Sequence, residues 1–405
     1  MQTQIPSFSQ DFDIRKFHQV TIQDKKYNTQ STFTIPLRYS NLNFLNAGAQ
    51  GTVVIADDAV RGERVAIKKM QRPFVMTMSA KRAYREFVLL TTIKHPNIIR
   101  LLNAFTPDSS LDTFQEVYLV MELMAHDLHE VIRGVRLDHK MLSFFVYQTL
   151  CAIKHLHDSG VMHRVIYSKL SVSNYGFQDL KPSNIVVSER CELKILDFGL
   201  ARKTNVDTAM RMSDYVVTRY YRAPEVIFGL PYSEKMDIWS VGCIFAEMIN
   251  QKVLFPGDDR LDQWTQICKV MGSPNDDFIN KLSESAAFYV RNLGNYKSKS
   301  MSEIIPDCNF LEETENPKVN FTAPAARDLL SNMLKINPDE RYSVEDALQH
   351  PYVKLWFKEE EVNAPVSENR YNQEIDLAEK TLQEWKCLIF EEVKRYQTEH
   401  DIFCG

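Results

Sequence analysis

The chain has 405 residues, of which 44% are hydrophobic and 25% are charged. This is the composition of an ordinary globular protein, and the length suits two or three domain-sized units better than one core. The formal net charge of -5 gives no general electrostatic reason to expect nucleic acid or an anionic membrane as a partner. We therefore expect neither partner, and we expect a monomer.

The cysteines and the apolar runs indicate where in the cell the protein is located. The seven cysteines are scattered without a C-x-x-C pair, which is typical of reduced thiols. No run approaches the roughly 18 to 20 apolar residues that a membrane span needs, and the polar N-terminus lacks the apolar region of a signal peptide. We expect a soluble protein of the cytoplasm and nucleus.

Strand signals dominate the first part of the chain. Residues 1–38 are mixed and polar, with 32–35 as the only strand-like stretch, and we interpret them as an arm. Short β-rich runs separated by turn residues follow at 53–56, 65–68 and 117–121. One helix interrupts them, predicted over 80–93 from the spacing of its apolar residues.

Helical patterns dominate after Met124, at residues 140–157, 237–249 and 325–334. A further amphipathic helix over 377–396 is expected to pack on its own protein, with partner binding as the alternative. The predicted fold is α+β and bilobal. Its parts are an arm (1–38), a main domain (39–353) with a β-rich lobe (39–124) and a helical lobe (125–353), and a C-terminal extension (354–405).

The most informative motif occurs in two pieces. His163 and Arg164 are followed by a foreign segment, 165–178, and only then by Asp179-Leu180-Lys181-Pro182-Ser183-Asn184. Without the segment the string reads H-R-D-L-K-P-S-N. This resembles the catalytic signature of protein kinases, in which the Asp accepts the proton of the substrate hydroxyl and the Asn binds a metal ion.

The phosphate-binding motif of such an enzyme is present in altered form. Residues 47–53 read A-G-A-Q-G-T-V, and glycines let backbone amides approach phosphate oxygens. Taken alone, a two-glycine hairpin turn is the simpler interpretation. Asn46 stands where the first glycine of G-x-G-x-x-G belongs, and because Asn tolerates left-handed conformations we expect the turn to persist.

The remaining parts of a protein kinase occur in the expected order. V-A-I-K ends at Lys68, predicted to contact phosphates and to pair with Glu86 on the following helix. Asp197 begins D-F-G, and its carboxylate with the Asn184 amide forms a suitable oxygen pair for Mg²⁺. A-P-E ends at Glu225, with Arg341 as its expected ion-pair partner, and D-x-W-S-x-G begins at Asp237.

Residues 213–222, S-D-Y-V-V-T-R-Y-Y-R, resemble the activation loop of mitogen-activated protein kinases, which carry T-x-Y. Three further stretches narrow the resemblance to the Jun N-terminal kinase subgroup: A-K-R-A-Y-R-E (80–86), Y-L-V-M-E-L-M (118–124) and K-I-L-D-F-G-L-A-R (194–202). The middle residue of the subgroup's activation motif is Pro, so S-D-Y at 213–215 marks a divergent member. The resemblance implies phosphorylation of Ser213 and Tyr215 by a dual-specificity kinase.

The resemblance also implies substrates, cofactors and site residues. It implies transfer from ATP with Mg²⁺ to Ser or Thr preceding Pro, in stress-activated signalling, and binding of phosphatases and scaffolds through docking motifs. The implied catalytic residues are Asp179, Lys181, Lys68 and Glu86, with Asn184 and Asp197 binding metal. The implied nucleotide-binding residues are Leu45, Asn46, Ala47, Gly48, Ala49, Gln50, Gly51, Val53, Lys68, Met121, Glu122 and Met124.

The same resemblance assigns arginines to the activation phosphates. Phosphorylated Tyr215 is expected to meet Arg219 and Arg222, and phosphorylated Ser213 is expected to meet Arg82, Arg85, Arg164 and Arg202. The alternative is that these are ordinary surface charges.

The acidic docking patch of the family falls at residues 357–365, where Lys358 and Asn363 replace acidic positions. Three glutamates, 359–361, restore negative charge nearby. Binding of basic docking peptides and an ordinary solvated charge run are equal alternatives here.

Two hypotheses account for residues 165–178. As a translated insertion beside the metal and substrate sites, the segment is expected to reduce activity greatly, because small misplacement of catalytic groups can cost about a hundredfold in rate. A pseudokinase that acts as a scaffold is then the alternative function. As a retained intron, the segment would begin in a Val codon, which starts with GT, and could end in CAG at Gln178; its removal restores H-R-D in frame.

Overall fold

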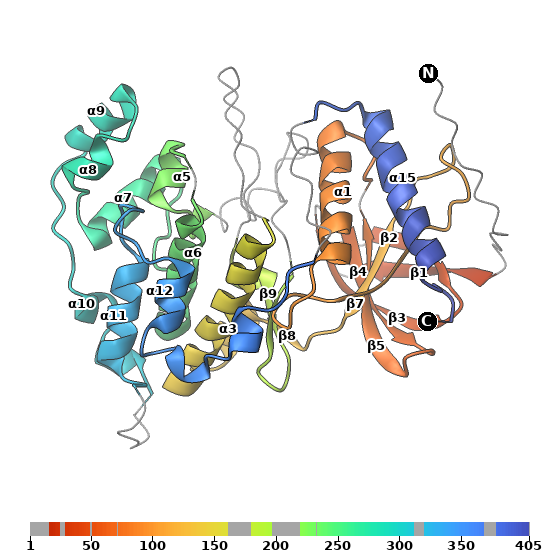
Figure 1. Cartoon of the computed structure of the whole chain (residues 1–405), viewed down its shortest axis with the longest axis horizontal. Coiled ribbons are helices and arrows are strands. Elements are labelled where there is room, and N and C mark those ends of the chain that lie inside the picture. The colour runs from red at the N-terminus through yellow and green to blue at the C-terminus, as the bar shows by residue number, and fades with distance from the viewer. Residues whose placement is uncertain are drawn as a thin grey trace. The chain divides into compact units, whose positions relative to one another are not determined.

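The computed structural model describes residues 16–24, 29–48, 51–70, 72–160, 180–196, 219–231, 233–311, 320–367 and 378–404. These residues form two compact units (Figure 1). The first draws on Met1–Val88, Arg100–Leu123 and Ala378–Gly405, and the second on Leu89–Ile99 and Met124–Leu377. The expectation of one β-rich and one mainly helical part is confirmed.

The first unit contains a five-stranded antiparallel sheet in the order β3-β4-β5-β7-β6. Its strands are β3 (Tyr39–Gly48), β4 (Gly51–Asp58), β5 (Glu63–Met70), β6 (Leu101–Phe105) and β7 (Tyr118–Glu122). β5 and β7 are rich in buried Val, Ile, Leu and Tyr, the residues that favour pleated backbone. Helices α1 (Thr77–Thr92) and α15 (Leu382–Glu399) lie side by side, with the rings of Tyr84 and Trp385 5.5 Å apart.

The predicted arm contains a β-hairpin. β1 (Phe17–Asp24) and β2 (Thr29–Pro36) pair antiparallel as a separate two-stranded sheet. The sequence suggested only 32–35, and it missed β1 because the run FHQVTIQD alternates apolar and polar residues too irregularly to stand out. The arm is therefore partly folded, with Phe17, Phe33 and Ile35 buried in the core of the first unit.

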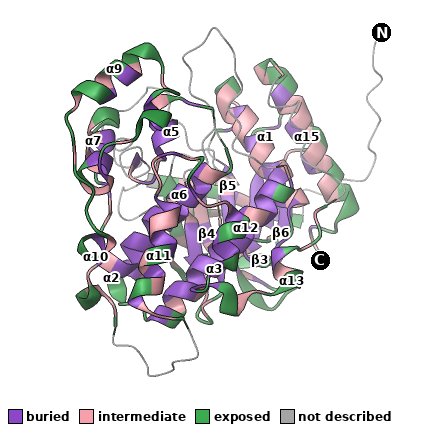
Figure 2. Cartoon of the chain, turned by 60° about the vertical axis from the view of Figure 1, so that its left-hand side comes forward, coloured by how far each residue is buried: buried purple, intermediate pink, exposed green. Residues whose placement is uncertain are grey.

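The second unit is mainly helical. It begins with β8 (His126–Asp127), α2 (Leu128–Gly134) and the central helix α3 (His139–Asp158), which Asp138 caps by accepting a hydrogen bond from Met141 N at 2.7 Å. A short sheet of β8, β9 (Ile185–Val187) and β10 (Leu193–Ile195) follows, with a 3-10 turn, η2 (Pro182–Asn184), before β9. Figure 2 shows that buried residues dominate α3.

The remaining helices continue the second unit. They are α5 (Pro224–Phe228), α6 (Lys235–Asn250), α7 (Arg260–Met271), α8 (Asp276–Ile279), α9 (Glu284–Asn292), α10 (Met301–Ile304), α11 (Ala323–Met333), α12 (Val344–Gln349) and α13 (Glu359–Val362), with 3-10 turns η3 (Asp307–Asn309) and η4 (Lys354–Trp356). Within the described ranges, no helix is long and apolar enough to cross a bilayer. The helices predicted at 140–157, 237–249 and 325–334 correspond to α3, α6 and α11.

Candidate active site

Lys68 and Glu86 form an ion pair inside the first unit. Lys68 Nζ lies 2.5 Å from Glu86 Oε1, and the two side chains are only 11% and 14% exposed. Lys68 projects from β5 and Glu86 from α1, the placement that the sequence predicted. Because a buried ammonium is costly to desolvate without an opposite charge, the carboxylate fixes Lys68 in one position on the sheet.

Strand register places other predicted nucleotide-site residues on the same face as Lys68. Val53 of β4 is directly opposite Lys68 of β5, and Met121 of β7 is directly opposite Ala66. Opposite residues share a face, and so do residues two apart along one strand. Val53, Lys68 and Met121 therefore line one surface of the sheet, although they are far apart in sequence.

The phosphate loop is the connection between β3 and β4. Leu45, Asn46, Ala47 and Gly48 end β3, while Ala49 and Gln50 lie outside the described residues. Asn46 pairs with Val53 in the ladder, after a register shift between Phe44 and Asn46. Asn46 is not among the described non-glycine residues with positive φ. β3 and β4 still pair as far as Gly48 and Gly51, so the hairpin forms without a left-handed residue at Asn46. The bulge absorbs the irregularity instead.

Gly51 is the glycine that the loop requires. A Cβ built on Gly51 would lie 2.2 Å from the carbonyl oxygen of Lys69 on β5. No side chain fits that distance, so the start of β4 can approach β5 only with glycine at this position. Gly48, by contrast, has no neighbour within 4 Å of a built Cβ.

Met121, Glu122 and Met124, which are predicted to contact the nucleotide, lie at the end of β7 and the start of the second unit. Met121 is 9% exposed, and Glu122 Oε1 accepts a hydrogen bond from Arg100 N at 2.8 Å. The Glu122 side chain is thus turned to the neighbouring backbone. Met124 is partly buried and belongs to the second unit.

The catalytic loop is described from Leu180 onward. Lys181 is 9% exposed and precedes η2, which ends at Asn184. The carbonyl oxygen of Asn184 accepts a hydrogen bond from Leu196 N at 2.9 Å. This bond brings Asn184 next to the residue that precedes Asp197. Asp179, Asp197, Arg164 and the 165–178 segment lie outside the described residues.

The end of the activation segment is anchored by a buried ion pair. Arg341 donates from Nη1 to Glu225 Oε1 at 2.6 Å and from Nη2 to Glu225 Oε2 at 3.0 Å, and both side chains are 0% exposed. This pairing was predicted from A-P-E and is confirmed. Bidentate arginine–carboxylate pairs are geometrically specific, so α5 is fixed firmly to the α11–α12 region.

Two further anchors were missed from the sequence. His157 Nε2 lies 2.8 Å from Asp237 Oδ2, joining the end of α3 to α6. Burial alone would lower the pKa of His157, but the hydrogen bond and charge of Asp237 outweigh it and raise that pKa. Tyr221 OH donates to Glu247 Oε2 at 2.6 Å, and burial beside this carboxylate raises the pKa of Tyr221. Neither His157 nor Glu247 belongs to the motifs used above.

The activation residues are only partly described. Ser213, Tyr215 and Arg202 lie outside the described residues. Arg219 is 5% exposed and donates from Nη1 to Gly257 O at 3.1 Å, whereas Arg222 is partly buried. Arg82 and Arg85 are partly buried on α1. Their roles in reading phosphate remain predictions.

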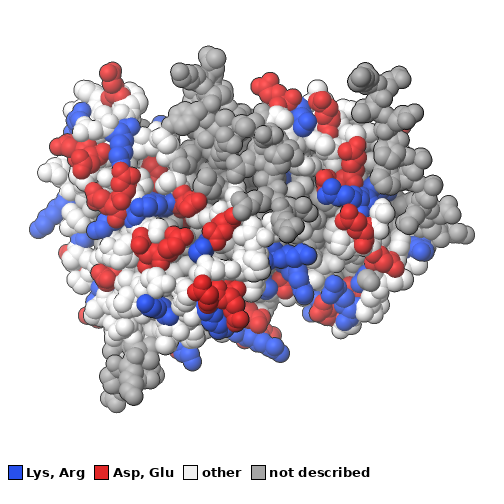
Figure 3. Space-filling view, viewed as in Figure 1, with Lys and Arg blue, Asp and Glu red and all other residues white. Residues whose placement is uncertain are grey.

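The glutamates at 359–361 lie beside Lys358 and Asn363, the two residues that replace acidic positions. Glu361 accepts from Lys358 Nζ at 2.7 Å and from Tyr147 OH at 3.1 Å. Glu359 accepts from Asn363 Nδ2 at 2.5 Å. The substituted residues Lys358 and Asn363 therefore bind two of the three glutamates that were expected to restore the charge. On the face shown in Figure 3, acidic and basic side chains are intermixed.

Comparison with known proteins identifies the class that this geometry defines. Residues 39–353 match the family described as "Protein kinase domain". The chain belongs to the protein kinase family, whose members use ATP and Mg²⁺.

Individual relatives place the chain more closely. It is 72% identical, over all 405 residues and all of the relative, to "GLH-binding kinase 1" of Caenorhabditis elegans. It is 48% identical to "Stress-activated protein kinase JNK" of Drosophila melanogaster, over 93% of this chain and 97% of the relative. It is 49% identical to the protein of the same name in Suberites domuncula, over 91% and 96%. The chain is thus related to the JNK stress-activated kinases.

Proposed function

We propose that the chain is a serine/threonine kinase that phosphorylates Ser-Pro and Thr-Pro sites and is activated by phosphorylation of Ser213 and Tyr215. The observation that supports it most is the Lys68–Glu86 pair, set on the same sheet face as Val53 and Met121. ATP supplies the phosphoryl group, and Mg²⁺ offsets its negative charge. The residue types fit both, since Lys68 offers a fixed cation and Asn184 a hard oxygen donor.

The proposed roles of the residues follow from their chemistry. Asp179 accepts the proton of the substrate hydroxyl as the phosphoryl group passes to its oxygen, and Lys181 and Lys68 stabilise phosphate charge. Glu86 acts on the reaction only through Lys68, so it is a positioning residue. Asn184 and Asp197 are the proposed metal ligands.

The proposed function also includes protein partners. They are an upstream dual-specificity mitogen-activated protein kinase kinase, and phosphatases and scaffolds that bind through docking motifs. One relative is named as GLH-binding, and we include a GLH protein among the candidates for this chain.

Phosphate transfer to a pair of peptides tests the proposal. The peptides differ only in Ser-Pro against Ser-Ala, and the enzyme is first treated with an active upstream kinase. We expect transfer to the Ser-Pro peptide alone, and its loss in Asp179→Asn. Transfer that is equal for both peptides would contradict proline-directed specificity, and transfer that persists in Asp179→Asn would contradict the role of Asp179.

A pseudokinase scaffold is the second candidate, because residues 165–178 separate Arg164 from Asp179. Comparing the full chain with a variant lacking these residues separates the two. Activity only in the shortened variant would mean that the segment, when translated, inactivates the enzyme. Inactivity of both, with retained partner binding, would favour the scaffold. Sequencing of transcripts across Arg164 and Asp179 shows whether the segment is an intron.

A further inference from the structure

The β1–β2 hairpin depends on side-chain contacts for its position. Among the described residues it is a separate two-stranded sheet and shares no ladder with the five-stranded sheet. An isolated two-stranded hairpin is marginally stable in water, so it needs a packed face. That face is supplied by Phe17, Phe33 and Ile35, which enter the core cluster of the first unit.

Part of that core comes from the opposite end of the chain. Residues 401–404 form a turn that directly follows α15, and Ile402 is 3% exposed within the same cluster as Phe17. The Phe403 ring stands edge-on to Phe17 with centroids 5.4 Å apart, and Lys16 Nζ lies 4.8 Å above the Phe403 ring. The 401–404 turn therefore covers the start of β1.

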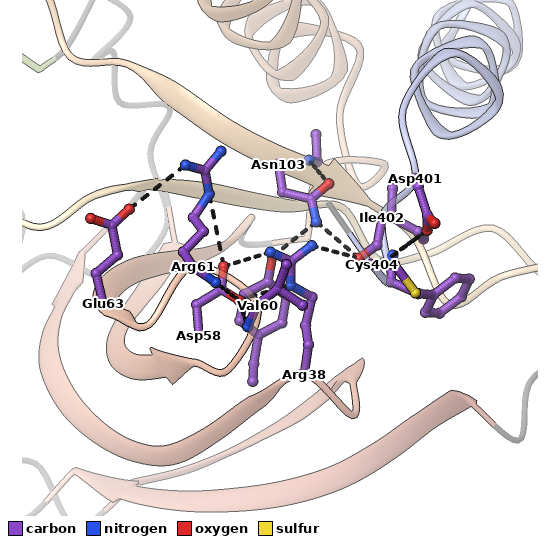
Figure 4. A network of polar contacts seen from close by, with 12 residues as sticks. Arg38, Asp58, Val60, Arg61, Glu63, Asn103, Asp401, Ile402 and Cys404 are labelled. Carbon is purple, nitrogen blue, oxygen red and sulfur yellow. Dashed lines mark hydrogen bonds and ion pairs between the residues drawn. The ribbon is translucent and has the colours of Figure 1, made fainter.

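The backbone of the turn completes a buried polar network (Figure 4). The carbonyl oxygen of Ile402 accepts from Asn103 Nδ2 at 3.1 Å and from Arg38 Nη1 at 3.5 Å. Arg38 is also bound to Asp58 through Nε at 2.9 Å and Nη2 at 2.8 Å. Without Ile402, donors of Asn103 and Arg38 would lose a partner in a buried place, which is costly.

Hydrogen bonds within the turn fix its shape. Asp401 Oδ1 accepts from Phe403 N at 2.9 Å and from Cys404 N at 3.0 Å, and these two bonds lower the pKa of Asp401. α15 is held by the buried side chains of Trp385, Ile389 and Val393. Because the turn begins two residues after α15 ends, docking of the helix keeps the turn at a high local concentration.

We propose that the 401–404 turn is a clasp for the β1–β2 hairpin, so that release of the turn lets the hairpin open while the five-stranded sheet stays folded. Both described ring contacts of Phe403 are with residues at the start of the hairpin, Phe17 and Lys16. Ile402 O, by contrast, accepts from Arg38 and from Asn103 of β6, so loss of the Phe403 ring removes contacts of the hairpin in particular. The ladders of the five-stranded sheet run between its own strands, β3, β4, β5, β7 and β6, and do not include residues 401–404. The device couples α15 to a hairpin that is separate from it in sequence.

Hydrogen exchange of the full chain tests the clasp. The variant is Phe403→Ala, and the matched control is Phe288→Ala in α9, whose side chain is 71% exposed. We expect the amides of β1 and β2 to exchange about tenfold faster in Phe403→Ala, from the loss of one aromatic pair and its burial. Amides of β4 and β5 should be unchanged, and Phe288→Ala should behave as the parent chain.

Two variants at Asp401 test the clasp without changing a buried apolar side chain. Asp401→Ala removes the acceptor that shapes the turn, and Asp401→Asn retains a side-chain oxygen there. Faster hairpin exchange in Asp401→Ala, largely restored in Asp401→Asn, would support the clasp. Unchanged hairpin exchange in both Phe403→Ala and Asp401→Ala would overturn it. Equal acceleration in β4 and β5 would also overturn it, since the turn would then only stabilise the whole unit.

Discussion

The two units each contain a buried arginine–carboxylate pair, but they complete it differently. In the second unit, Arg341 satisfies its remaining donors with carbonyl oxygens of Lys235, Lys335 and Ile336, and its guanidinium lies 5.2 Å from the Trp239 ring. In the first unit, Arg38 donates from Nη1 to the carbonyl oxygen of Ile402, 364 positions away in the sequence. The donors of Arg341 are thus satisfied by carbonyl oxygens of the same region, whereas Arg38 depends on a turn that is distant in sequence.

The difference shows what a motif can and cannot specify. A-P-E and a downstream arginine are recognisable side chains, so their pairing could be predicted. The partner of Arg38 is a backbone carbonyl, which every residue carries, so no sequence pattern marks it. Buried ion pairs stabilise a fold only when their remaining polar groups also have hydrogen-bond partners. Nearby carbonyl oxygens provide them in the second unit, and the carbonyl oxygen of Ile402 provides one in the first.

Glu225→Ala is expected to have the largest effect. It leaves the fully buried Arg341 guanidinium without its carboxylate. The free energy of unfolding should fall by about 3 to 5 kcal/mol, as for other buried pairs that lose one partner. Urea unfolding followed by tryptophan fluorescence measures this. A loss below about 1 kcal/mol would mean that the pair is not the anchor described here.

Asp58→Ala should have the next largest effect. It removes the carboxylate from Arg38 and the acceptor of Val60 N, but Arg38 keeps its contact with Ile402. We expect a loss of about 2 to 3 kcal/mol in the free energy of unfolding. The double variant Arg38→Met/Asp58→Leu is the sharper test, because it should be less destabilised than either single change. Additive losses would contradict a coupled pair.

The Lys68–Glu86 pair offers a contrast, because under the proposed function it serves activity more than stability. Glu86→Gln should lower kcat about a hundredfold while costing about 1 kcal/mol of stability. Initial rates and thermal unfolding on the same preparation separate the two effects. Losses of similar size in activity and in stability would mean that this pair mainly stabilises the fold, as the Glu225–Arg341 and Arg38–Asp58 pairs do.

The smallest effect concerns pH and the His157–Asp237 contact. The pKa of His157 is raised in the folded chain, so its contribution to stability is fully present below the unfolded pKa and is lost as pH rises through the folded pKa. The parent chain should therefore lose some stability between about pH 6 and pH 8, close to the ordinary titration range of histidine. His157→Gln should lose this slope. An unchanged slope in the variant would assign it to another group.

Much of the fold and of the candidate site could be predicted from the sequence. The strands that contain Lys68 and Met121, the helix that contains Glu86 and the Glu225–Arg341 pair all follow from motifs with fixed local structure. The sequence could not show β1, whose alternation is weak and which is ordered mainly by packing on distant residues. Nor could it show that Asn46 stays extended, because the compensating bulge depends on strand register.

The separation of 364 positions between Arg38 and Ile402 also bears on how the protein is made. At ordinary rates of synthesis, roughly 20 to 70 s separate the appearance of these two residues on the ribosome. During that time the whole second unit is synthesised, while the first unit still lacks α15 and Ile402. The first unit is therefore the last to be completed, and its apolar core stays without Ile402 until that residue has been synthesised.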